Sequence, residues 1–172
     1  MNLFETELNR LRGMPEGPID EGLLTGNMVI KSAEDHDVII RRAMEALRVV
    51  DETILSDWKH FPTLEQWSAI LPHWFIDACG PERSKEESLA WLKWFRSLPL
   101  PQQGEAMRES KWSLNAWTYW FQPAQRNWYW GRQLGSDGEH FMVELWCIDW
   151  PCATDSFSWL VRAAGAEACA AE

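Results

Sequence analysis

The sequence lacks an apolar run that could cross a membrane. A transmembrane helix needs about 20 consecutive apolar residues, and no stretch of this chain approaches that length. Positive charge is also scarce, since 16 Lys and Arg stand against 26 Asp and Glu, for a net charge of −10. Nucleic acid and anionic membranes repel such a chain, whereas basic proteins attract it. We therefore expect neither nucleic acid nor a membrane as its partner.

The short motifs of common catalytic and nucleotide-binding sites are missing as well. The chain contains no GxGxxG, GxxxxGK[ST], HExxH or GxSxG pattern. A Cys79 nucleophile with His73 or His60 as its base is disfavoured, because six residues along one helix put Cys79 and His73 on different faces. The sequence thus favours a protein without catalytic residues or a cofactor.

Cysteine is sparse, with Cys79, Cys147, Cys152 and Cys169. Residues 1–12 contain acids and lack the apolar segment of a signal peptide, which predicts a cytoplasmic protein with free thiols. The Cys147-x4-Cys152 spacing is wider than that of paired zinc ligands, and no second pair lies nearby. We predict no metal site and no disulfide.

What the chain has in excess is tryptophan, with 13 in 172 residues. Together with an apolar content of 46%, this composition predicts one globular domain over 1–172, with a loose tail at 166–172. Most indoles must lie in the core, since a soluble protein cannot expose so many in one patch. We expect burial for the indoles in the densest apolar stretches, which are Trp91, Trp94, Trp117 and Trp146.

Hydrophobic periodicity and capping residues predict that helices dominate the first two thirds of the chain. Ser32 is the expected cap of the longest helix, and two capping boxes, Thr63 with Gln66 and Ser84 with Glu87, are expected to begin two others. The segment that follows Ser84 is apolar at so many positions that we expect its helix to be largely buried. The expected helices lie at about 4–11, 32–58, 63–72, 73–79, 84–98 and 113–121, and a possible strand lies at 23–30.

The last third predicts a small sheet. Residues 126–134 and 140–148 have strand character, and the Gly135-Ser136-Asp137-Gly138 stretch between them is a hairpin signal. Asp155 can cap a final helix over 157–164. The fold class is therefore α+β, mostly helical, with a small antiparallel sheet built on this C-terminal hairpin and a closing C-terminal helix.

Eight aromatic residues fall between Trp112 and Trp130. A stacking platform for single-stranded nucleic acid would need basic neighbours, and this chain is acidic. Packing of a helix on a sheet is the plainer explanation. The functional alternative is that one strand face presents Trp128 and Trp130 to a protein partner.

Negative charge is concentrated near the N-terminus, where residues 1–40 hold eight acids and three bases. A solvated surface explains this most simply, and a patch that binds a basic partner is the functional alternative. Several of these acids flank loops marked by Pro and Gly, from which side chains can reach a partner. The candidate partner-binding acids are Glu16, Asp20, Glu21, Glu34, Asp35, Asp37, Asp137 and Glu139.

Several tryptophan motifs lie in about the last third of the chain: Trp112-Ser113-Leu114, Trp117-x-Tyr119-Trp120-Phe121, Trp128-Tyr129-Trp130, Asp149-Trp150-Pro151 and Trp159-Leu160-x-Arg162-Ala163-Ala164-Gly165. These motifs resemble small Trp-rich bacterial proteins of unassigned function. In size, acidity and lack of a catalytic motif, the chain also resembles the immunity proteins of bacterial toxin systems, as a class and without any matching site residue. The second resemblance implies a protein that plugs a cognate toxin with acidic and aromatic side chains.

Two functional hypotheses follow. The first is a cytoplasmic protein-binding module of the immunity type, which neutralises a basic toxin domain by binding it. The alternative is an enzyme or small-ligand-binding protein with a Trp-lined pocket near His140 and Asp149. A deep pocket with convergent polar groups would favour the alternative, and an acidic face with exposed rings would favour the binding module.

Overall fold

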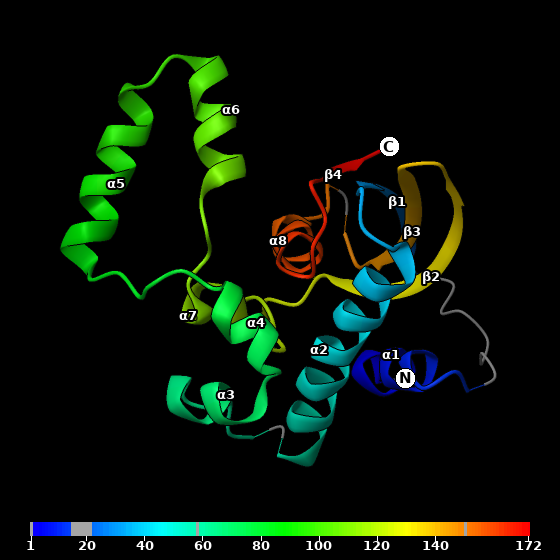
Figure 1. The fold of residues 1–172 in the computed structure, drawn as a ribbon. Coiled ribbons are helices and arrows are strands. Elements are labelled where there is room, and N and C mark those ends of the chain that lie inside the picture. Colours follow the sequence, from blue (N-terminus) through cyan, green and yellow to red (C-terminus); the bar gives the residue numbers. More distant parts are fainter. Residues whose placement is uncertain (1, 15–21, 58, 150) are drawn as a thin grey trace.

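A computed structural model describes residues 2–14, 22–57, 59–149 and 151–172. Within these ranges the chain has the predicted α+β fold, with a four-stranded sheet packed against helices (Figure 1). The helices are α1 (Leu3–Leu11), α2 (His36–Ser56), α3 (Leu64–Ile70), α4 (His73–Ala78), α5 (Lys85–Ser97), α6 (Leu100–Glu109), α7 (Leu114–Tyr119) and α8 (Asp155–Ala163). The strands are β1 (Leu24–Lys31), β2 (Trp128–Asp137), β3 (His140–Cys147) and β4 (Ala168–Ala171).

The sheet is antiparallel throughout, in the order β2-β3-β1-β4. The predicted hairpin is therefore present as β2 and β3, and the candidate strand at 23–30 is confirmed as β1, one of the two inner strands. The prediction of a loose tail at 166–172 is wrong, because β4 pairs with the outer edge of β1 and the Glu167 N–H donates to the Lys31 carbonyl at 2.9 Å. That edge would otherwise expose unpaired backbone groups.

One continuous core lies where α1, α2, α7 and α8 meet the sheet. Two buried indoles converge on Ser156 at the start of α8: the Trp117 N–H donates to its carbonyl at 3.0 Å, and the Trp128 N–H donates to its hydroxyl at 2.9 Å. Because an indole nitrogen is costly to bury without an acceptor, these bonds fix α7 and β2 against α8.

Two predicted caps differ in the structure. Ser32 does not cap α2, because β1 continues to Lys31 and the Ser32 hydroxyl accepts from the Glu34 N–H. The cap is Asp35, whose carboxylate accepts from the Asp37 N–H at 3.0 Å. Asp155 lies in the first turn of α8 and is not its cap.

The prediction of a buried helix at 84–98 is wrong. Helices α5 and α6 form a hairpin that projects from the body of the molecule (Figure 1), and neither helix contains a buried residue. Trp94 is 49% exposed and Trp91 is half-buried, whereas Trp117 and Trp146 lie in the core as predicted. Periodicity identifies an apolar helix face, but it does not tell whether another element covers that face.

This contrast predicts unequal effects of truncating two tryptophans. Trp117→Ala removes a fully buried ring, and we expect it to lower the free energy of unfolding by about 3–5 kcal/mol. Trp94→Ala should change that free energy by less than about 1 kcal/mol, because the ring already contacts solvent. Urea unfolding followed by far-UV circular dichroism measures both variants. Similar losses would contradict the separation of the projecting hairpin from the core.

Candidate binding surfaces

The first candidate surface lies where β1 ends beside the β2–β3 turn. The Lys31 ammonium lies 3.7 Å from a Glu139 carboxylate oxygen and 3.4 Å from one of Glu167. The Ser32 N–H donates to the Glu139 carbonyl at 2.8 Å. The loop that enters α2 therefore lies beside the turn, and two segments far apart in the sequence bring their acids to the same end of the sheet.

We call this group of exposed carboxylates the acidic end. Glu167 belongs to it and was missed in the sequence, because it lies in the tail that was expected to be loose. In the described part of the chain, Lys31 is the base that forms ion pairs with this group. The members of the acidic end are Glu34, Asp35, Asp37, Asp137, Glu139 and Glu167. The other predicted acids, Glu16, Asp20 and Glu21, lie outside the described residues.

The structure removes Trp128 and Trp130 from the candidate partner-binding residues. Their exposed fractions are 1% and 3%, because the first residues of β2 lie between α1 and α8. Both rings contact Phe157 of α8, with ring centroids 5.3 and 6.1 Å apart. Both are core residues, in agreement with the explanation that the aromatic cluster packs a helix on a sheet.

The expected pocket near His140 and Asp149 is not formed by those residues. His140 begins β3, whereas Asp149 follows its last residue, Cys147, so that the length of the strand separates them. Both side chains are exposed. A Trp-lined cavity does exist, but it lies elsewhere in the fold.

That cavity is the second candidate surface and lies at the base of the projecting hairpin. It has a volume of about 410 Å³ and is walled mainly by Trp91 of α5, Met107 of α6, Trp112 and Trp120. Trp112 and Trp120 pack against the core, and Trp91 stacks on Phe95 with ring centroids 5.0 Å apart. The local density of tryptophan was the only sequence signal for it.

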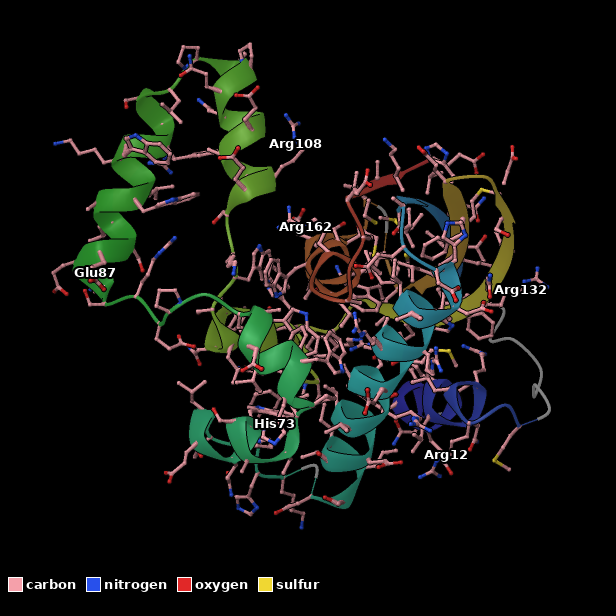
Figure 2. The ribbon with its side chains drawn as sticks, in the orientation of Figure 1. Arg12, His73, Glu87, Arg108, Arg132 and Arg162 are labelled. Carbon is pink, nitrogen blue, oxygen red and sulfur yellow. The ribbon has the colours of Figure 1, made fainter. Side chains whose placement is uncertain are left out.

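The hairpin leaves and rejoins the body at one point. Gly80 bridges to Ser113, and the Gly80 N–H donates to the Trp112 carbonyl at 2.9 Å. A Cβ at Gly80 would lie 3.0 Å from the Lys111 Cβ, so this close approach favours glycine. From α8, Arg162 donates to the carbonyls of Arg108 and Ser110 near the end of α6 (Figure 2).

A buried charge network in the core is the strongest cluster of titratable groups. The Arg126 guanidinium lies 2.6 Å from Glu7 of α1 and also donates to the Trp128 carbonyl. The second Glu7 oxygen accepts from the Trp130 N–H. Arg126, Glu7 and Asp51 of α2 are all closed to solvent, so this network holds helices against β2 and offers no site to a substrate.

Burial raises the pKa of both carboxyl groups in this network. For Asp51 the pKa lies well above its usual range, because loss of solvent and the neighbouring Glu7 charge both disfavour ionisation. For Glu7 the rise from burial is opposed by Arg126 and by the Trp130 N–H. A protonated Asp51 can donate to Glu7, whereas two ionised groups would leave both Asp51 oxygens without a partner.

Cys79 is poorly suited to nucleophilic chemistry. Burial raises the pKa of its thiol to about 11, so the thiolate is scarce at neutral pH, and His73 on the same segment is exposed. Within the described ranges, no three His, Cys, Asp or Glu side chains come together as a ligand set for a metal. No described helix is long and apolar enough to cross a membrane. Comparison with known protein families, curated proteins and solved structures found no match.

The buried network predicts how stability depends on pH. The folded state keeps a proton on Asp51 that the unfolded chain releases above about pH 4. The stability that protonated Asp51 gives to the folded state is complete at acidic pH. It declines as the pH rises toward the raised pKa of this group. Asp51→Asn cannot ionise and can still donate to Glu7. We therefore expect the variant to lose less stability than the wild type between about pH 5 and about pH 8 in urea unfolding. Parallel pH profiles would contradict a protonated Asp51.

Proposed function

We propose that the chain is a cytoplasmic protein-binding module of the immunity type, which neutralises a cognate bacterial toxin by binding a basic domain of it. The observation that carries this proposal is the acidic end. Its carboxylates come from three separate segments and remain exposed, and only Lys31 pairs with them in the described part of the chain. A basic partner would neutralise this charge.

The net charge of −10 supports the same proposal. An acidic surface speeds the encounter with a basic partner by long-range attraction, and salt weakens this effect. Acids that stay at the rim of an interface act mainly on the association rate. Apolar contacts at the centre then slow dissociation.

The projecting hairpin can supply such apolar contacts. Leu89, Trp94 and Leu100 are exposed on it at 58%, 49% and 82%. An exposed indole is a typical anchor at a protein interface. Trp94 is the strongest single anchor, because an indole contributes more contact area than the other side chains.

Charge reversal at the acidic end tests the proposal. Neither Glu34 nor Asp137 makes a side-chain hydrogen bond or ion pair with another described residue, so the double variant Glu34→Lys/Asp137→Lys should keep its fold. With the product of the adjacent gene as the partner, we expect the association rate to fall about tenfold or more at low salt. The difference from wild type should shrink as salt is added. Stopped-flow fluorescence measures the rate.

Glu65→Lys/Asp77→Lys on α3 and α4 is the matched control, since it changes the net charge equally at exposed positions outside both the acidic end and the projecting hairpin. The proposal predicts a smaller loss of rate in this control. An equal fall in the association rate of both variants would show that net charge alone causes the effect, and it would contradict a binding role for the acidic end. If no partner is captured and the purified chain turns over a small molecule, the hypothesis of a binding module is wrong and the enzyme hypothesis takes its place.

A further inference from the structure

We propose that the Trp-lined cavity at the base of the projecting hairpin binds an aromatic carboxylate. This site goes beyond the protein-binding function and uses side chains outside the acidic end. It joins a wall of indole rings to two cations, Arg83 and Lys111. Its volume of about 410 Å³ falls in the range of small-molecule pockets.

The aromatic walls are held in place before any ligand arrives. Trp112 and Trp120 pack against the core, and the Trp112 carbonyl is bonded to Gly80. Trp91 is stacked on Phe95, with only 14° between the ring planes. Because Trp112 and Trp120 lose little freedom on binding, a flat aromatic ligand can pack against them at low entropic cost.

The charges at the cavity select for an anion. Neither Arg83 nor Lys111 forms an ion pair with a described residue. The third charged side chain, Glu82, is already engaged, because one of its oxygens accepts from the Asn115 N–H at 2.9 Å. Residues 81–112 contain six Lys and Arg and five Glu, so this segment carries none of the net negative charge of the chain.

Two other ligand classes fit less well. An organic cation would seek the face of an indole, but the Arg83 guanidinium already lies over the Trp91 ring, 5.3 Å from its centroid. A neutral apolar ligand would fill the cavity but would leave both cations unpaired. An aromatic carboxylate can accept from Arg83 in a bidentate manner while its ring packs against Trp112 and Trp120.

Three probes of the same shape and different charge test the ligand class by isothermal titration calorimetry. They are 2-naphthoate, 2-naphthamide and 2-naphthylmethylammonium. We expect 2-naphthoate to bind at least about tenfold tighter than the amide, with the ammonium weakest. Equal affinity of acid and amide, tighter binding of the ammonium, or no binding of 2-naphthoate up to about 5 mM would each overturn the proposal.

Charge-removing variants locate the site. Arg83→Gln/Lys111→Gln should bring the affinity for 2-naphthoate down to that for the amide, while the amide still binds. Lys93→Gln/Arg96→Gln removes the same charge from the exposed side of α5 and should keep the preference for the acid. A preference that survives the first variant, or that disappears in the second, would overturn the proposal. Both results are independent of capture of a protein partner.

Discussion

The buried guanidinium of Arg126 is the constraint on which the body of the molecule depends. It precedes β2 and pairs with Glu7, which lies 119 residues earlier in the chain. The rings of Phe121, Trp128 and Tyr129 lie within 4.3, 4.3 and 5.0 Å of it. A buried charge without its partner costs several kcal/mol, so α1 cannot leave the sheet without exposing or stranding this pair. Removing the side chain of Glu7 or of Arg126 would therefore weaken the packing of α1 against β2.

This arrangement separates the parts of the protein that hold the fold from those that can bind. Both the aromatic cluster around Arg126 and the carboxyl pair of Glu7 and Asp51 are closed to solvent. The remaining candidates for function are surfaces: the acidic end beside Lys31 and the Trp-lined cavity under the projecting hairpin. They use different chemistry, since one presents exposed carboxylates and the other presents rings beside cations. The two proposals thus assign a protein partner and a small anion to separate places on one chain.

Most signals confined to a few neighbouring residues predicted the structure correctly, apart from the caps at Ser32 and Asp155, whereas signals that depend on distant partners did not. The capping boxes at Thr63 and Ser84 are both present, and so is the β2–β3 hairpin. The exposure of α5 could not be predicted, because its apolar positions are those of a core helix. Five of the six acids of the acidic end were found one by one, but their convergence depends on the pairing of Lys31 with His140, which local sequence does not encode.

Native-state hydrogen exchange tests the central claim that the projecting hairpin of α5 and α6 opens independently of the cooperatively folded body. Amides of β1 and β3 should exchange only by global unfolding, with the free energy that urea denaturation gives. Amides of α5 and α6 should exchange through local opening, at free energies lower by at least about 2 kcal/mol. Protection in α5 equal to that in β3 would show that the hairpin belongs to the cooperative core, and it would contradict the account of its side chains as free binding surfaces.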